Sequence, residues 1–97
     1  MKLSRNDIDE LKHKIGILVD DTNVQESYGI TQEQAEEIFD TIPNKPGEWI
    51  IPDWMKPVIV GEMEDHVKLL RDIAKTVEPS KSLPIYKQAS RLEKMFQ

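Results

Sequence analysis

The stretch from Gly47 to Pro57 constrains the fold of this chain more than any other. It reads GEWIIPDWMKP and contains both tryptophans, two adjacent isoleucines and two of the six prolines. Pro52 and Pro57 lack a backbone N–H and have a fixed φ, so neither fits the interior of a helix or of a central strand. The other residues are too apolar for a solvated loop, because monomeric proteins rarely expose large apolar patches. We therefore expect this tryptophan segment (residues 47–57) to be an ordered connector packed across helices.

The two tryptophans in this segment allow two interpretations. In the first, Trp49 and Trp54 both fill the core, as large aromatic side chains usually do. In the second, at least one of them is an anchor for a partner, because tryptophan is enriched among the residues that dominate binding energy. The apolar character of the segment favours the first interpretation and leaves the second open.

Four other stretches space their apolar residues as amphipathic helices do. The predicted helices are residues 6–20, 31–42, 57–78 and 84–96. Thr31 and Gln34 form a capping box at the start of the second helix. Asp53 is the expected N-cap of the third, although Pro57 at a first-turn position offers a second possible start, and Ser82 with Pro84 marks the start of the fourth. The sequence therefore predicts an all-α fold: a single domain forming a small irregular bundle of about four helices, with the tryptophan segment packed across it.

Two stretches of the chain are less certain in secondary structure. The run Ile15–Val19 is apolar and β-branched enough for a short buried strand, and Gly16 weakens a helix by about 1 kcal/mol. The helical spacing begins well before that run, which favours the helix. Residues 20–29 are polar and are expected to be a loop, because their carboxylates and amides do not match the ligand positions of a calcium loop.

Composition and charge narrow the functional classes. The 97-residue chain has no cysteine, which excludes disulfides and thiolate zinc sites and suits a reducing compartment such as the cytoplasm. It has no apolar run of the roughly 20 residues that a membrane span requires. The net charge is −5; residues 1–50 carry 5 Lys/Arg against 11 Asp/Glu, and residues 51–97 carry 8 against 7. Direct binding to nucleic acid is therefore not expected, because it depends on neutralising phosphates.

The charges form one ridge on each of two predicted helices. The acidic ridge consists of Glu33, Glu36, Glu37 and Asp40. The basic ridge consists of Lys87, Arg91 and Lys94. A charged helix face is usually only solvated, and exposed ion pairs contribute little stability. The alternatives are that the two ridges face each other, or that the acidic ridge imitates a row of phosphates and binds a basic partner.

The sequence contains no catalytic, nucleotide or metal motif. Its four glycines stand alone, and its two histidines, His13 and His66, are far apart and have no neighbouring ligand pattern. His66 lies near the apolar face of its predicted helix, where a histidine at the edge of the core is commoner than a ligand or a base. We expect no enzyme activity, no cofactor and no metal.

These observations predict a non-enzymatic protein–protein interaction or regulatory module that occupies the surface of a partner protein. The candidate binding residues are Trp49, Trp54 and the acidic and basic ridges. One alternative is an acidic inhibitor that competes with nucleic acid for a basic cleft; small phage-encoded inhibitors share its size and charge. Another is a structural subunit that self-assembles, for example as a homodimer.

Overall fold

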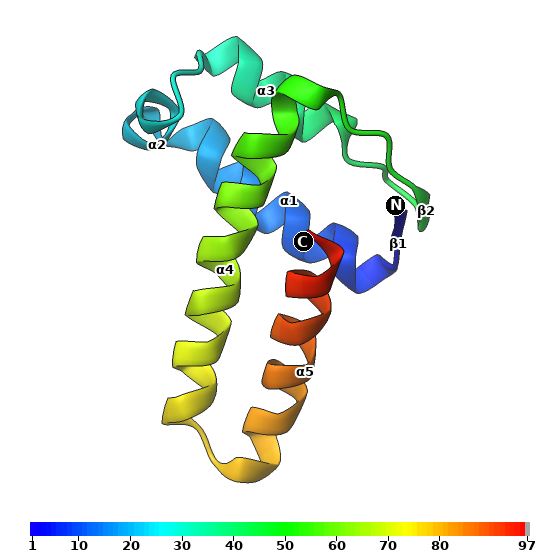
Figure 1. Cartoon of the computed structure of the whole chain (residues 1–97), viewed down its shortest axis with the longest axis vertical. Helices are drawn as coiled ribbons and strands as arrows, with labels where there is room; N and C mark the ends of the chain where they lie inside the picture. The colour runs from blue at the N-terminus through cyan, green and yellow to red at the C-terminus, as the bar shows by residue number, and fades with distance from the viewer. Residues whose placement is uncertain (97) are drawn as a thin grey trace. The chain divides into compact units, whose positions relative to one another are not determined.

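The computed structural model describes residues 1–96 and confirms the predicted all-α fold (Figure 1). The helices are α1 (Arg5–Asp20), α2 (Thr22–Ser27), α3 (Gln32–Thr41), a 3₁₀ helix η1 (Asp53–Met55), α4 (Lys56–Thr76) and α5 (Pro79–Met95). Two very short strands, β1 (Lys2–Leu3) and β2 (Gly47–Glu48), accompany them. The chain forms two compact units, Met1–Ile59 and Val60–Gln97, which are described in turn. The expectation of a single domain stays a prediction.

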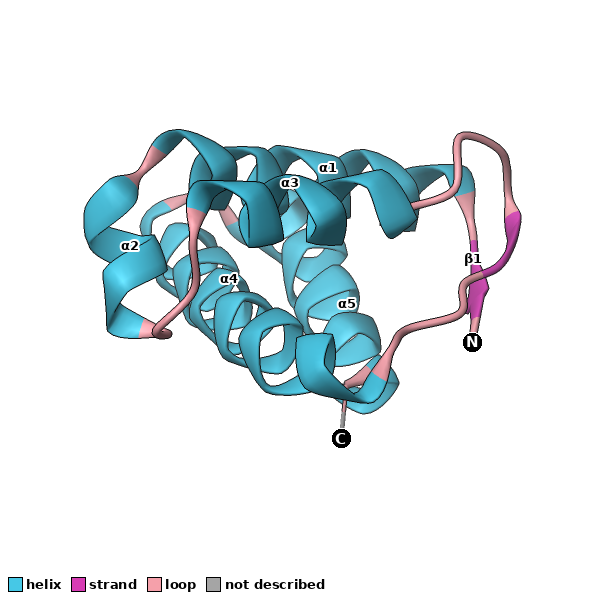
Figure 2. Cartoon of the chain, turned by 90° about the horizontal axis from the view of Figure 1, so that it is seen from above, coloured by secondary structure: helices cyan, strands magenta, loops and turns pink. Residues whose placement is uncertain are grey.

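α1 is the central helix of the first unit, and both α2 and α3 pack against it (Figure 2). Its buried apolar residues, Ile8, Leu11, Ile15 and Leu18, recur three or four positions apart, the spacing that places them on one face of a helix. Gly16 faces Phe39 of α3, and a Cβ built on this glycine would lie 3.8 Å from Phe39 Cε2. The helix therefore continues through Ile15–Val19, the run for which a strand was the alternative, because its apolar face packs against another helix.

Both α1 and α3 begin with a capping box. At α3, Thr31 Oγ1 accepts a hydrogen bond from the Gln34 amide at 3.2 Å, and Gln34 Oε1 accepts one from the Thr31 amide at 2.9 Å. This confirms the predicted start. At α1, Ser4 and Asp7 form the same reciprocal pair, with distances of 3.2 and 2.8 Å. Asp7 is fully buried, which its role as the acceptor of the Ser4 amide helps to offset.

The prediction of a loop over residues 20–29 is wrong, because this stretch contains α2. Asp21 Oδ1 accepts hydrogen bonds from the amides of Asn23 and Val24 and so caps the new helix. Gln25, in the middle of α2, is buried. Its side-chain nitrogen donates to the carbonyls of Leu18 and Val19, each at 3.0 Å. Polarity indicated a loop here, but the helix forms because one polar side chain is used internally.

The tryptophan segment begins in a two-residue antiparallel ladder that pairs Leu3 with Gly47. The Trp49 amide extends the ladder by donating to the Met1 carbonyl at 2.8 Å. The amino group of Met1 also forms an ion pair with Glu48, and this hydrogen bond and charge lower the pKa of that carboxyl. A ladder of this length has no alternating pattern to read, which is why the sequence did not reveal it.

The second unit is an antiparallel hairpin of α5 and the part of α4 that follows Ile59, joined by a short turn (Figure 1). α5 begins at Pro79 and not at Pro84, so the predicted N-cap role of Ser82 is wrong. The amides of Lys81 and Ser82 both donate to the carbonyl of Glu78, which starts the helix. Pro79 occupies a first-turn position, where a proline loses no helical hydrogen bond.

Pro84 is therefore inside α5. Its ring removes one intrahelical hydrogen bond, to the carbonyl of Ser80. Both residues are exposed, so water can satisfy that carbonyl, and the helix tolerates the proline near its beginning. The expected cap of α4 is also different: Asp53 opens η1 instead, and α4 follows from Lys56 with Pro57 in its first turn.

Candidate interaction surfaces

The tryptophan segment places its two indoles in different environments. Trp49 is 3% exposed, and its Nε1 donates to Thr41 Oγ1 at 3.2 Å. Trp54 is 42% exposed, and Ile50 is 82% exposed. The core interpretation therefore describes Trp49 and not Trp54. As a candidate binding residue, Trp49 lies where its side chain cannot reach a partner without local opening.

The backbone that carries Ile50 and Trp54 is fixed on both sides. Trp49 holds the beginning of the segment through its buried ring and its ladder hydrogen bond. At the other end the Met55 amide donates to the Pro52 carbonyl at 3.0 Å, and the Met55 side chain is buried. Ile50 and Trp54 are thus apolar side chains presented from an ordered backbone.

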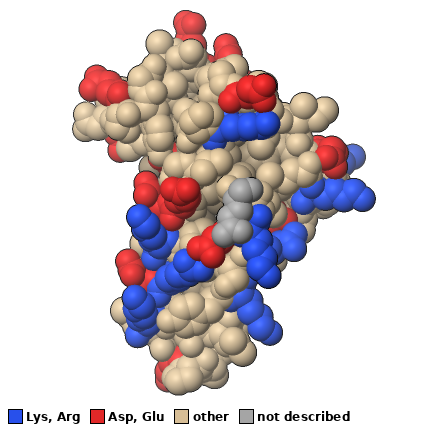
Figure 3. All heavy atoms as spheres, viewed as in Figure 1, with Lys and Arg blue, Asp and Glu red and all other residues tan. Residues whose placement is uncertain are grey.

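The acidic ridge lies on the exposed face of α3. All four of its residues are exposed, and Figure 3 shows carboxylates over α2 and α3. Glu36 accepts a hydrogen bond from Gln32 at 3.4 Å. Within residues 1–96, no lysine or arginine forms an ion pair with any of the four carboxylates. The ridge is therefore left free to interact with an external cationic group.

The basic ridge lies on α5. Lys87, Arg91 and Lys94 are all exposed, and Figure 3 shows Lys and Arg side chains along the helices of the hairpin. The two ridges belong to different compact units. The expectation that they face each other stays a prediction.

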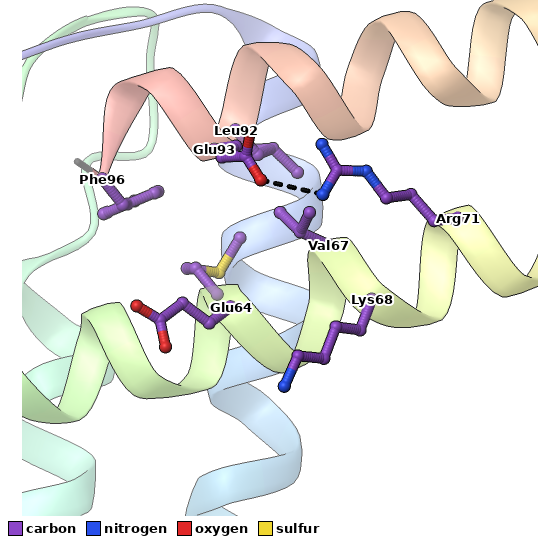
Figure 4. A pocket seen from close by; sticks show the side chains of 8 residues that line it. Glu64, Val67, Lys68, Arg71, Leu92, Glu93 and Phe96 are labelled. Carbon is purple, nitrogen blue, oxygen red and sulfur yellow. Dashed lines mark hydrogen bonds and ion pairs between the residues drawn. The ribbon is translucent and has the colours of Figure 1, made fainter.

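A groove between α4 and α5 was not predicted. It has a volume of about 300 Å³ and is lined by Met63, Glu64, Val67, Lys68, Arg71, Leu92, Glu93 and Phe96. Figure 4 shows Arg71 reaching from α4 to Glu93 of α5, close to Val67 and Leu92. Arg71 Nη1 lies 2.8 Å from Glu93 Oε2. The sequence shows each residue on its own helix, but only the pairing of the helices brings them together.

The Arg71–Glu93 ion pair gives a pH-dependent signature. The hydrogen bond from Arg71, followed by its charge, lowers the pKa of Glu93. A carboxyl group with a lowered pKa stabilises the fold above its unfolded pKa, and this contribution is lost as the pH falls through the folded value. We expect Arg71→Gln to move the pKa of Glu93 back up, measured by NMR titration of its side-chain carbon. An unchanged pKa would show that the pair does not persist in solution; Glu78, which is exposed on the same unit, provides the control.

The hairpin also exposes apolar side chains, although apolar spacing was the basis for predicting both of its helices. Ile73 is 41% exposed and Tyr86 is 38% exposed. Leu69 and Leu83 are 52% and 57% exposed. Helical spacing identifies which residues share a face, but the width of the covered part of that face depends on the neighbouring elements.

The described part of the chain contains neither a metal-holding cluster of side chains nor a helix that could span a membrane. His13 is exposed and His66 is buried on α4. Among residues 1–96, no three or more histidine, aspartate or glutamate side chains converge to hold an ion. None of the described helices combines the length and apolar character needed to cross a bilayer.

Comparison of the chain with protein-family models, curated proteins and solved structures gives no match. What the chain binds is therefore inferred from its own surfaces.

Proposed function

We propose that this chain is a non-enzymatic interaction module that binds a partner protein through Ile50 and Trp54. The observation that carries the proposal is the division within the tryptophan segment between a buried Trp49 and exposed Ile50 and Trp54. An indole on an ordered backbone loses little conformational entropy on binding, so much of its buried area contributes to affinity. Tryptophan is also among the residues most enriched at binding hot spots.

A second candidate is the acidic inhibitor that competes with nucleic acid for a basic cleft. It is favoured by one separate observation, the four exposed carboxylates of α3 that have no ion pair within residues 1–96. Residues three and four apart on a helix have side chains about 5–6 Å apart. The acidic ridge is thus a line of negative charge on a rigid support, and such a line suits a surface that otherwise binds phosphates.

Affinity capture with matched variants tests the first proposal. The full chain is immobilised and exposed to an extract of its source cells, and retained proteins are quantified by mass spectrometry. We expect Trp54→Ala to reduce the affinity for the retained partner at least tenfold, because hot-spot truncations cost about 2 kcal/mol or more. Leu83→Ala, which removes an exposed apolar side chain of the second unit, is the matched control and should leave the affinity unchanged.

The same experiment distinguishes the alternatives. One outcome would be that reversing the four charges of the acidic ridge abolishes binding of the partner while Trp54→Ala binds it normally. That outcome would support the nucleic-acid competitor and contradict the first proposal. A second readout is the fluorescence of Trp54, observed in the Trp49→Phe background, which should shift to the blue when a partner covers it. If no protein is retained and sedimentation shows association that increases with concentration, the chain is a self-assembling subunit instead.

A further inference from the structure

The strand β2 has one open edge, which leads directly into Ile50. The sheet contains two strands among the described residues, so β2 pairs with β1 on one side only. In Figures 1 and 2 the two strands lie side by side, and no other described segment of the first unit lies beyond β2. The outer side of β2 is therefore accessible along its length.

The register of the ladder decides which main-chain groups face this open edge. Residues of an antiparallel ladder alternate between pairs bonded across it and pairs whose N–H and C=O groups point outward. Trp49 is bonded across the ladder, since its amide donates to the Met1 carbonyl at 2.8 Å. Glu48, the preceding residue of the ladder, therefore points its main-chain groups outward. Ile50 lies on the same edge, because no turn or bend interrupts residues 48–52 and an extended chain repeats every two residues.

The outward main-chain groups have no partner within residues 1–96. No hydrogen bond joins the amides or carbonyls of Glu48 and Ile50 to another described residue, and both residues are exposed. The Ile50 side chain is 82% exposed, more than any other large apolar side chain of the described residues. An edge with unpaired donors and acceptors at a two-residue repeat matches the main chain of another extended segment.

We propose, in a step that rests on the function proposed above, that the partner is held by strand addition. An extended segment of the partner protein pairs with Glu48 and Ile50 along the outer edge of β2, and one of its apolar side chains covers Ile50. A helix could not use this edge, because its main-chain groups are bonded internally. A second copy of the chain is disfavoured, because residues 1–59 carry 6 Lys/Arg against 12 Asp/Glu and two such units repel each other. Pro52 has no N–H and limits the paired segment to a few residues.

The probe for this edge is the extended peptide acetyl-KTVTVTK-amide, titrated into the isotope-labelled full chain and followed by the NMR signals of the backbone amides. The matched control is the same peptide N-methylated at its five central residues, which keeps every side chain but removes those N–H donors. We expect saturable shifts of the Glu48 and Ile50 amides, and at least tenfold weaker binding of the methylated peptide, because each lost main-chain hydrogen bond weakens binding about fivefold. Exchange of these two amides with solvent should slow at saturation, while that of Trp49, already bonded to Met1, should not change. Equal binding of both peptides, or the absence of saturable shifts, would overturn the proposal.

Two substitutions at Ile50 separate the main-chain contact from the side-chain contact. Ile50→Pro removes the outward donor and should weaken binding of the unmethylated peptide about fivefold or more. Ile50→Val keeps the donor and a β-branched apolar side chain, so it is the control and should bind as the parent chain does. Circular dichroism checks that both variants are folded, and the methylated peptide tests the same hydrogen bonds without altering the chain. An Ile50→Pro variant that is folded and binds normally would contradict strand addition.

The captured partner distinguishes a failure of strand addition from a failure of the proposed function. If the partner binds Trp54→Ala normally, the proposed function and strand addition both fail. If Trp54→Ala loses the partner, but the Glu48 and Ile50 amides of the parent chain exchange equally fast with and without it, only strand addition is wrong. Slow exchange of both amides in the free chain, together with sedimentation as a dimer, would assign the edge to a second copy and overturn the proposal.

Discussion

Replacing Trp49 by alanine is expected to lower the free energy of unfolding by about 3–5 kcal/mol, the usual cost of truncating a large buried aromatic residue. The side chain is 3% exposed, and its truncation leaves a cavity beside the end of α3. This loss is a large part of the 5–15 kcal/mol that typical domains possess. Urea unfolding followed by circular dichroism measures it, because that signal does not depend on the indole that is removed.

Two further substitutions separate the causes of this effect. Trp49→Phe keeps most of the apolar volume but removes the Nε1 donor to Thr41. The Thr41 hydroxyl still donates to the Ile38 carbonyl at 2.7 Å, so the extra cost of the lost hydrogen bond should be about 1 kcal/mol. Trp54→Ala is the matched control, and its cost should stay below about 1 kcal/mol because the ring is half exposed. If Trp49→Ala and Trp54→Ala lowered the free energy of unfolding equally, the division between a buried and an exposed tryptophan would be contradicted.

Replacing Gln25 by leucine is expected to lower the free energy of unfolding by about 1–3 kcal/mol, because the Val19 carbonyl loses its side-chain donor and the Leu18 carbonyl keeps only its 3.4 Å hydrogen bond from the Asp21 amide. The side chains are similar in size, so the effect reports hydrogen bonding more than packing. The Gln25 side-chain nitrogen donates to the carbonyls of Leu18 and Val19 at the end of α1. It also donates to Gln32 Oε1 in the first turn of α3 at 2.7 Å. This one amide group connects three helices.

The control for Gln25→Leu is a substitution of Gln32, whose side chain accepts one of the hydrogen bonds from Gln25. Gln32→Ala removes one of the three contacts and leaves both α1 carbonyls satisfied, so its cost should be about 0.5 kcal/mol, as for other exposed substitutions. Denaturant unfolding measures both variants, and amide hydrogen exchange across α2 shows whether this helix opens first. A Gln25→Leu variant as stable as the parent chain would mean that water satisfies the α1 carbonyls and that α2 is held by other contacts.

Local sequence signals predicted the parts of the fold that depend on local physics. The start of α3 follows from the capping pair Thr31 and Gln34, whose partners are three residues apart. The buried face of α1 follows from apolar spacing, which a helix converts directly into one stripe. Where long-range contacts decide, the predictions are wrong: the polarity of residues 20–29 indicates a loop, whereas α2 forms with Gln25 bonded to α1 and α3. The predicted start of α5 is too late, because a proline usually begins or ends a helix, whereas Pro84 lies inside this one.

The candidate surfaces divide in the same way. Exposure of the acidic and basic ridges could be predicted, because charged residues at helical spacing remain on the outside of a helix whatever packs on the other side. The exposure of Trp54 could not, since Trp49 and Trp54 belong to one apolar run and have similar local surroundings. The groove and its Arg71–Glu93 pair join residues far apart in the chain, and no local pattern relates them.

The amino-acid sequence by itself determined that this chain is helical, where its main helices lie and which charges line their outer faces. These properties follow from the backbone hydrogen bonding and the side-chain periodicity of short segments. Only the tertiary structure decided which tryptophan is buried, that a buried glutamine connects three helices, and that an arginine and a glutamate meet across a groove. The physical reason is that burial and pairing depend on which surfaces meet, and that is a property of the folded chain rather than of any one segment.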